Sequence, residues 1–278
     1  MTKLGKIEKA VEIVSAELYE EGNVNTAVVG ATGTGKDFSV IIPNILLEEE
    51  KNLVVIDPLN QISNVYTFKE KQGYHILRYD LEKEGALQQL QTDLLNQPEG
   101  KVLIHAYFPN TFIGNKERYS QLVWEFLKIV KEKQDVEWRK EKSLHLFLMD
   151  YEWYSSEKFH NILQTWCGYR ISTTFSVQHL RVLDDTIRDN CHYILYKRIT
   201  DLETAEWIAY KLKYHHVEFY SELLSTDLLY LPLTAGMLMD LPLGAGFLQK
   251  NKGKDRWLKI VETYNAEDIL GRPLYTTV

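Results

Sequence analysis

One stretch of the chain combines glycines and a lysine at a spacing suited to phosphate binding. It begins at Gly30 and contains the pattern Gly-x-x-x-x-Gly-Lys, which ends at Lys36. Glycines let the backbone bend so that successive N–H groups point at phosphate oxygens, and the lysine adds positive charge near the β- and γ-phosphates. An apolar run precedes the stretch and a helical pattern follows it, and the start of a helix favours anions. The alternative is a glycine-rich turn that only reverses the chain. The residues predicted to contact a nucleotide are Gly30, Ala31, Thr32, Gly33, Thr34, Gly35, Lys36 and Asp37.

The residue after the lysine departs from the usual pattern. Serine or threonine normally stands there and gives a hydroxyl ligand to Mg²⁺, whereas this chain has Asp37. A carboxylate also binds Mg²⁺. Its charge repels a triphosphate, however, by roughly 3 kcal/mol per unit of phosphate charge at about 5 Å and an effective dielectric of about 20. We therefore predict either tightly Mg²⁺-dependent ATP binding or weak binding, with Asp37 as a candidate metal ligand.

A scaffold has to position this loop, and the pattern of apolar runs predicts one. Short, nearly continuous apolar runs alternate with helical stretches, which is typical of parallel strands covered on both faces. The predicted strands are residues 26–29, 53–56, 75–79, 102–107, 145–149, 171–177 and 193–196. Residues 119–130 and 202–212 are predicted helices, the second capped by Asp201, and 245–249 with 257–261 form a predicted hairpin on the sheet's edge. The fold class is therefore α/β, with a mostly parallel central sheet and helices on both faces.

Composition narrows the class of protein further. The chain has 278 residues, 45% of them hydrophobic, a formal net charge of −7 and only two cysteines, Cys167 and Cys191. These values exclude a disulfide framework and a surface that is basic all round. We expect a cytoplasmic protein, because no segment has the apolar length of a membrane span and no signal peptide opens the chain. The expected organisation is an amphipathic helix over residues 1–22, a nucleotide-binding domain over 23–264 and a tail over 265–278.

Further stretches occur in the order and spacing of a known family. They are Pro43-Asn-Ile-Leu46, Val54-Val-Ile-Asp57-Pro58, Leu146-Phe-Leu-Met-Asp150-Tyr-Glu152, Gln178-His-Leu-Arg181, Asn190-Cys191 and Asp201-Leu-Glu-Thr-Ala-Glu206. With the phosphate loop, and over roughly residues 23–262, they resemble the motor domain of the TraG/TraD-type conjugative coupling proteins. These are type IV secretion ATPases of the HerA/FtsK-like P-loop group. The resemblance implies a RecA-like P-loop NTPase fold, ATP and Mg²⁺ as cofactors, and movement of DNA by a ring of six subunits. It also implies docking to a relaxase and to the secretion channel.

The chain departs from this family in three respects. Residues 57–61 read Asp-Pro-Leu-Asn-Gln, where the family has Asp-Pro-Lys-Gly-Glu. Residues 81–99 leave room for little more than one helix, where the family carries an all-helical domain. The family also carries an N-terminal membrane anchor, and we expect none in this protein. We therefore expect a compact form that a separate anchor subunit recruits to the inner face of the cell membrane.

The resemblance assigns roles to residues at the ends of the predicted strands. Asp150 follows a hydrophobic strand, where a Walker B aspartate holds Mg²⁺ through water. Glu152 is the candidate for orienting the attacking water, although in a continuing strand it would share the face of Asp150. Alternatively, both acids are ordinary polar residues that close a buried strand. Gln178 is the candidate sensor of the γ-phosphate. A ring ATPase is expected to use an arginine from a neighbouring subunit, and Arg170 and Arg181 are the nearest candidates.

The leading hypothesis is an ATP-binding or ATP-hydrolysing motor or coupling protein in conjugative DNA transfer. Asp37, the altered 57–61 stretch and the displaced Glu152 favour an alternative, a catalytically degenerate adaptor that docks relaxase or channel components. A second alternative is a viral genome-packaging ATPase of the wider HerA/FtsK-like group. The pairs Cys191-His192 and His215-His216 have no matching ligand set around them, so we expect no metal there.

Overall fold

The computed structural model describes residues 24–96, 100–108, 115–136, 143–159, 165–212, 216–219, 229–252, 257–263 and 266–271. The helix predicted over residues 1–22 lies outside these residues. By its internal contacts the chain divides into two compact units. The first unit contains residues 24–44 and the described residues from 177 to 263. The second contains the described residues from 45 to 176 and residues 266–271.

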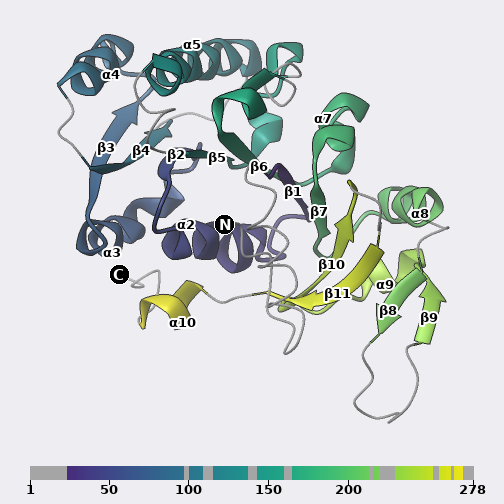
Figure 1. Cartoon of the computed structure of the whole chain (residues 1–278). Coiled ribbons are helices and arrows are strands. Elements are labelled where there is room, and N and C mark those ends of the chain that lie inside the picture. Colours follow the sequence, from purple (N-terminus) through teal and green to yellow (C-terminus); the bar gives the residue numbers. More distant parts are fainter. Residues whose placement is uncertain are drawn as a thin grey trace. The chain divides into compact units, whose positions relative to one another are not determined.

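The second unit is built on a parallel sheet (Figure 1). Its strands are β2 (Asn52–Ile56), β3 (Tyr74–Asp80), β4 (Lys101–Tyr107), β5 (Leu144–Leu148) and β6 (Ile171–Val177), in the order β3-β4-β2-β5-β6. Every neighbouring pair is parallel. All residues of β2, β5 and β6 are buried, which explains why these strands read as continuous apolar or small-residue runs. The carboxyl ends of all these strands therefore meet at one edge of the sheet.

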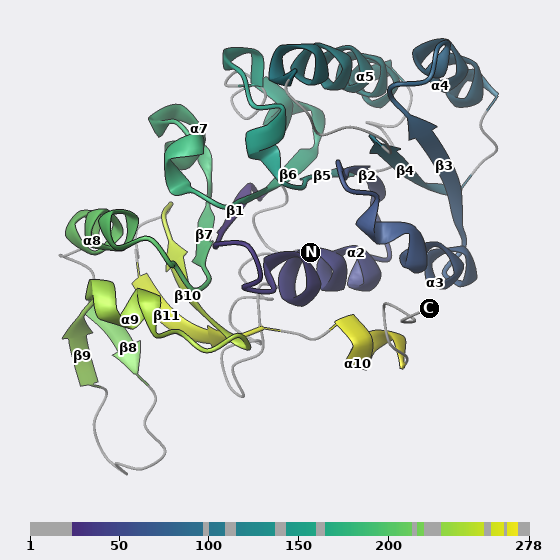
Figure 2. The ribbon, with the colours of Figure 1, turned by 180° about the vertical axis from the view of Figure 1, so that it is seen from behind.

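Helices cover both faces of this sheet. They are α3 (Tyr66–Lys71), α4 (Ala86–Leu95) and α5 (Lys116–Val136). The unit also contains the short α10 (Ala266–Leu270) and 3₁₀ turns at Gln61–Val65, Tyr151–Trp153, Glu157–Phe159 and Cys167–Tyr169. In Figures 1 and 2, α4 and α5 lie on one face and α3 lies on the other. Helix α5 buries residues at steps of three and four, including Tyr119, Val123, Phe126 and Val130, as its apolar stripe predicts.

The first unit has a mixed sheet. Its strands are β1 (Thr26–Val29), β7 (Tyr193–Tyr196), β8 (His216–Phe219), β9 (Leu229–Pro232), β10 (Ala245–Lys250) and β11 (Trp257–Glu262), in the order β1-β7-β10-β11-β8-β9. The pairs β1–β7 and β11–β8 are parallel, and the other pairs are antiparallel. Its helices are α7 (Asp185–Asn190), α8 (Leu202–Lys211) and α9 (Ala235–Met239), with a 3₁₀ turn at Leu180–Val182. A π-helical turn, Asp37–Ile41, follows the phosphate loop and continues into α2 (Ile42–Leu47).

The predicted elements agree closely with the structure. All seven predicted strands are present within one residue at either end. Asp201 caps α8, because its carboxylate accepts a hydrogen bond from the Thr204 N–H at 2.8 Å. Helix α4 is the one helix among residues 81–96, the part of this range that the structure describes.

Two expectations differ from the structure. The β10–β11 hairpin forms, but it is not at the edge of the sheet, because β8 pairs with β11 and β9 pairs with β8. These two strands have only four residues each, which is too short for the sequence pattern to reveal them. The segment expected to be a tail contains α10.

The end of β1 approaches β7 too closely for a side chain. A Cβ atom on Gly30 would lie 2.7 Å from the Lys197 Cβ and 2.8 Å from the Thr34 Oγ1. The Lys197 N–H donates to the Val29 carbonyl oxygen at 2.7 Å, which extends the β1–β7 pairing to this point. Glycine at position 30 is therefore required by packing.

One lysine of the second unit is completely buried. The Lys69 Nζ donates to the Glu48 carbonyl oxygen and to the Gln72 Oε1, and it lies 4.0 Å from the centre of the Tyr74 ring. Burial lowers the pKa of Lys69 to about 7, because the charged form loses its hydration. The folded chain therefore holds this proton less tightly than the unfolded chain does.

We expect Gly30→Ala to lower the free energy of unfolding by about 1–3 kcal/mol, because the new methyl group overlaps Lys197 and Thr34. Gly244→Ala in the same unit is the control, since a Cβ atom added there would meet no other atom within 4 Å. That substitution should change stability by less than about 0.5 kcal/mol. Urea denaturation measures both. Equal stability of the two variants would contradict the close approach of β1 and β7.

We expect Lys69→Met to flatten the dependence of stability on pH above neutrality. Between pH 7 and the lysine pKa of the unfolded chain, the unfolded state binds more protons at this group. The free energy of unfolding therefore rises with pH by up to about 1.4 kcal/mol per pH unit from Lys69. Urea denaturation at pH 7 and pH 9 measures the slope. Lys71→Met, an exposed position on the same helix, should keep the slope, and an unchanged slope in Lys69→Met would refute the assignment.

Candidate functional site

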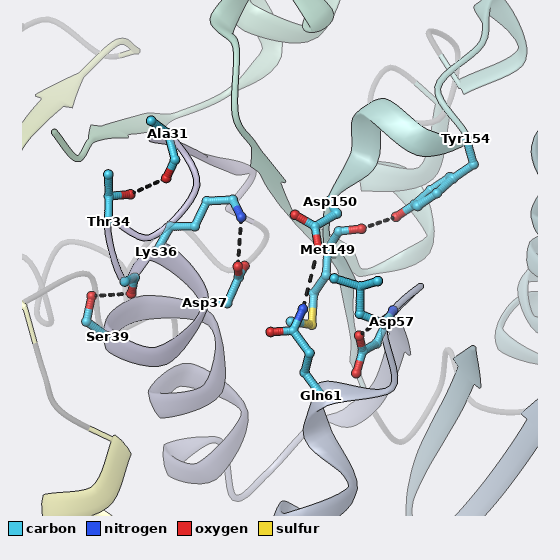
Figure 3. A network of polar contacts seen from close by, with 12 residues as sticks. Ala31, Thr34, Lys36, Asp37, Ser39, Asp57, Gln61, Met149, Asp150 and Tyr154 are labelled. Atoms are coloured by element: carbon cyan, nitrogen blue, oxygen red, sulfur yellow. Dashed lines mark hydrogen bonds and ion pairs between the residues drawn. The ribbon is translucent and has the colours of Figure 1, made fainter. Parts of the chain in front are cut away.

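The predicted phosphate loop forms a turn between β1 and the helical segment that begins at Asp37 (Figure 3). Gly33 and Gly35 have φ angles of +77° and +75°, which side-chain-bearing residues rarely adopt. The Thr34 hydroxyl donates to the Ala31 carbonyl oxygen at 2.7 Å, and the Ser39 hydroxyl donates to the Gly35 carbonyl oxygen at 2.7 Å. These bonds hold the curvature of the loop, as a cradle for phosphate requires.

Backbone hydrogen bonds fix the start of the loop. The Gly30 N–H donates to the Val177 carbonyl oxygen at 3.0 Å, and the Ala31 N–H donates to the Arg198 carbonyl oxygen at 3.3 Å. Val177 ends β6 and Arg198 follows β7, so the loop begins where strand ends meet. The tip of the loop, Thr32 and Gly33, is exposed.

Lys36 and Asp37 form an ion pair within the loop. The Lys36 Nζ lies 2.7 Å from the Asp37 Oδ2, and the two side chains are only 6% and 11% exposed (Figure 3). The carboxylate therefore offsets the positive charge that the loop offers to an anion. A phosphate has to compete with Asp37 for Lys36, unless a cation draws the carboxylate away. This contact gives a structural basis for the predicted dependence of ATP binding on Mg²⁺.

A tight turn follows β5 in the second unit. The strand ends at Leu148, and Asp150 has a φ angle of +44°, so the strand does not continue to Glu152. Tyr151 turns into the core, where its ring makes edge-on contacts with Tyr154, Phe159 and Phe175 at centroid distances of 5.0–5.7 Å.

This packing explains why an aromatic residue separates the two acids. Asp150 is buried and Glu152 is half-buried on the 3₁₀ turn. The Tyr154 hydroxyl donates to the Met149 carbonyl oxygen at 3.1 Å, which ties the turn back to the strand end (Figure 3). The prediction for a continuing strand, that Glu152 shares a face with Asp150, is therefore wrong, because the backbone leaves the strand before Asp150.

A second loop reaches Asp150 from the end of β2. Asp57 is fully buried, and its carboxylate accepts hydrogen bonds from the N–H groups of Leu59 at 3.2 Å and Ile62 at 2.9 Å. Asn60 has a φ angle of +54°, at the position where the coupling-protein pattern has glycine. Asparagine is among the residues that tolerate this conformation. The loop therefore keeps a left-handed turn without the glycine.

Gln61 stands where the family pattern has glutamate. Its Nε2 donates to the Asp150 Oδ2 over a long 3.5 Å contact (Figure 3). A glutamate would place a second negative charge against Asp150, whereas the amide can donate to it. The substitution is visible in the sequence, but the contact with Asp150 forms only in the folded chain.

The remaining predicted site residues lie on β6 and after it. Gln178 directly follows β6 and is half-buried. Arg170 directly precedes β6, and its guanidinium donates to the Ser143 hydroxyl at 3.4 Å. Because β5 and β6 are parallel, Arg170 lies at the opposite edge of the sheet from Asp150, roughly 23 Å away along a seven-residue strand. The structure does not bring these two residues together. Arg181 is exposed and pairs with Glu203 at 2.6 Å. The catalytic roles remain predictions.

Two buried groups near the strand ends were not identified from the sequence. The Lys197 Nζ donates to the Leu243 carbonyl oxygen at 2.6 Å and to the Thr263 hydroxyl at 2.8 Å, and burial lowers its pKa to about 8. His105 is fully buried on β4 and contacts Asp57. The sequence offered two signals for these groups. One is a lysine directly after the apolar run of β7, and the other is a histidine within a buried strand.

The described residues do not suggest a metal site built from protein side chains alone. No group of three or more His, Cys, Asp or Glu side chains gathers among them. Burial raises the pKa of Cys191 to about 12, so its thiol stays protonated. The His192 Nδ1 accepts a hydrogen bond from the Asn25 N–H at 3.1 Å.

In the described part of the chain, no helix is both long and apolar enough to span a bilayer.

Comparison with known proteins gives one family. The family described as "Type IV secretory system Conjugative DNA transfer" matches residues 6–88. This segment contains the phosphate loop, the Pro43–Leu46 stretch and the Asp57–Gln61 loop. No curated protein matches the sequence.

Solved structures of two kinds share the fold. The bacterial conjugative coupling protein TrwB lacking its first 70 residues, in complex with sulphate, has a TM-score of 0.60 and 13% identity, over 95% of this chain and 90% of that one. TrwB with ADP and Mg²⁺ has a TM-score of 0.59 and 12% identity, over 87% and 85% of the two chains. The genome-packaging NTPase B204 of Sulfolobus turreted icosahedral virus 2, with ATPγS, has a TM-score of 0.52 and 10% identity, over 87% and 98%.

At these identities the structural matches establish the fold and no more. They confirm the predicted α/β class with a mostly parallel sheet. Together with the family match over residues 6–88, they also confirm the predicted resemblance. The chain has the RecA-like P-loop NTPase fold and is similar to the TraG/TraD-type conjugative coupling proteins.

Proposed function

We propose that the chain is an ATP-binding and ATP-hydrolysing motor or coupling protein in conjugative DNA transfer through a type IV secretion system. The observation that carries this proposal is the glycine turn between β1 and a helix, with Lys36 at the start of that helix. The family match over residues 6–88 supports the role in DNA transfer. The structures of TrwB with ADP and Mg²⁺ and of B204 with ATPγS support ATP and Mg²⁺ as cofactors.

The described residues suit these cofactors in part. The loop N–H groups and Lys36 of the first unit would bind the phosphates. Asp37 in the first unit and Asp150 in the second are each a candidate ligand of Mg²⁺, because carboxylate oxygens suit this ion. When bound, Mg²⁺ would supply positive charge that offsets the charge of the phosphates. Glu152 would orient a water molecule and Gln178 would respond to the γ-phosphate. Arg170 lies far from Asp150 in its own chain, so it would serve only a neighbouring copy.

The partners in this proposal follow from the resemblance. They are DNA held in a homo-hexameric ring, a relaxase and a membrane-anchor subunit of the secretion channel. The protein would work in the cytoplasm, held at the inner face of the membrane through the anchor subunit.

Two alternatives have specific support. The buried Lys36–Asp37 ion pair and the glutamine at position 61 favour an adaptor that keeps the fold without turnover. The similarity to B204 favours a genome-packaging ATPase of a virus. The adaptor would show no ATP hydrolysis, and a packaging enzyme would be encoded beside a capsid protein rather than a relaxase.

We expect Lys36→Ala to weaken ATP binding at least tenfold, because the loop loses its positive charge. This corresponds to about 1.4 kcal/mol or more of binding free energy. Titration calorimetry with Mg²⁺–ATP measures the binding constant, and DNA-stimulated phosphate release measures turnover. Lys71→Ala, an exposed lysine on α3, should match the unaltered chain. If phosphate release by the unaltered chain is no faster than that of Lys36→Ala, the adaptor function is favoured.

We expect Asp37→Thr to strengthen ATP binding in EDTA at least tenfold, because the substitution frees Lys36 from its ion pair and removes a charge that repels phosphate. In excess Mg²⁺ the difference between the two chains should shrink. Glu206→Gln, an exposed acid on α8, removes the same charge elsewhere and should have no effect. Equally tight binding by the unaltered chain with and without Mg²⁺ would rule out this role of Asp37.

A further inference from the structure

A chain of contacts in the second unit runs from the surface to Asp57. The Tyr66 hydroxyl at the start of α3 makes a short hydrogen bond with the His105 Nδ1. On the other side of the ring, the His105 Nε2 lies 3.4 Å from the Asp57 Oδ2. His105 also stacks on Tyr107, with ring centroids 5.2 Å apart and planes inclined by 28°. The imidazole is therefore held by contacts at both nitrogens and on one face.

Tyr66 is the hydrogen-bond partner of His105 on the Nδ1 side of the ring. Burial raises the pKa of Tyr66 to about 12, so its hydroxyl stays protonated and can donate to the Nδ1 of His105. The His105 Nε2 faces the Asp57 carboxylate at 3.4 Å, at ion-pair distance but without the geometry of a hydrogen bond. Asp57 has no exposed surface, and a buried carboxylate is costly unless its oxygens accept hydrogen bonds. His105 thus places the Nε2 edge of its ring against the carboxylate oxygen that the Ile62 N–H holds.

The same carboxylate organises the loop that contacts Asp150. Its Oδ1 accepts from the Leu59 N–H and its Oδ2 accepts from the Ile62 N–H. Gln61 lies between these two anchored residues and donates to the Asp150 Oδ2. A shift of Asp57 would therefore move Gln61 away from the carboxylate that is the candidate Mg²⁺ ligand.

We propose that His105 is a positioning residue, which holds Asp57 and the 57–62 loop so that Gln61 orients the Asp150 carboxylate for Mg²⁺. This role rests on the proposed function in naming Mg²⁺ as the ligand. The contacts of His105, Asp57 and the loop amides belong to the chain itself and can be tested without nucleotide.

The first experiment measures hydrogen exchange without nucleotide in His105→Phe, which keeps an aromatic ring against Tyr107 and loses both nitrogen contacts. Exchange of the Leu59 and Ile62 amides should become at least tenfold faster, while exchange in α5 stays unchanged. Gln61→Ala should leave these amides unchanged, because it removes only the contact with Asp150. His75→Phe is the control, since His75 is exposed on the neighbouring strand β3. Unchanged exchange at Leu59 and Ile62 in His105→Phe would overturn the proposal.

The second experiment titrates Mg²⁺ into the full chain at a fixed ATP concentration and follows binding by calorimetry. In His105→Phe and Gln61→Ala, the Mg²⁺ concentration at half-saturation should rise at least threefold, while ATP affinity in EDTA stays unchanged. A purely structural defect would weaken both. Tyr66→Phe, which loses one hydroxyl, should shift half-saturation in the same direction and replaces His105→Phe if that variant does not fold.

The outcomes separate this role from the proposed function. If the unaltered chain binds Mg²⁺–ATP and half-saturation does not move in these variants, the positioning role is overturned and the proposed function stands. If the unaltered chain does not bind Mg²⁺–ATP, both are overturned.

Discussion

The close contact between the end of β1 and β7 is the constraint on which the phosphate loop depends. Gly30 has no room for a Cβ atom beside Lys197, and backbone hydrogen bonds tie Gly30 and Ala31 to the ends of neighbouring strands. The loop then turns through two glycines with positive φ, and the helical segment begins directly after Lys36. The position of the lysine therefore follows from the backbone geometry of the loop, which the Thr34 and Ser39 hydroxyls help to hold.

Charge within the loop decides how readily it can accept an anion. Lys36 is held by Asp37 at 2.7 Å, and both side chains are nearly buried. A hydroxyl at position 37 would leave the lysine charge available, whereas the carboxylate makes anion binding depend on competition or on a cation. Asp37 therefore bears on both leading functions. It would make ATP binding require Mg²⁺ in an ATPase, and it would oppose ATP binding in an adaptor that does not turn over ATP.

In the second unit, packing of the core decides where the acids stand. Tyr151 enters an aromatic cluster with Tyr154, Phe159 and Phe175, so the backbone turns at Asp150 and Glu152 falls on a 3₁₀ turn. The buried Asp57 organises a second loop that reaches Asp150 through Gln61. The surroundings of Asp150 are therefore assembled from the ends of β5 and β2, which are neighbours in the parallel sheet.

The sequence by itself determined the seven strands, the cap at Asp201, the phosphate loop and the family resemblance. These features depend on local apolar runs, turn residues and short motifs, which act through neighbouring positions in the chain. Only the tertiary structure decided that Asp37 pairs with Lys36, that Tyr151 is a core residue, that β8 and β9 extend the mixed sheet, and that Arg170 lies opposite Asp150. All four depend on side-chain directions or on pairing between distant segments. The strand partner of a segment, and the direction in which its last residue points, are set by packing across the sheet, and packing of this kind leaves no local pattern in a single sequence.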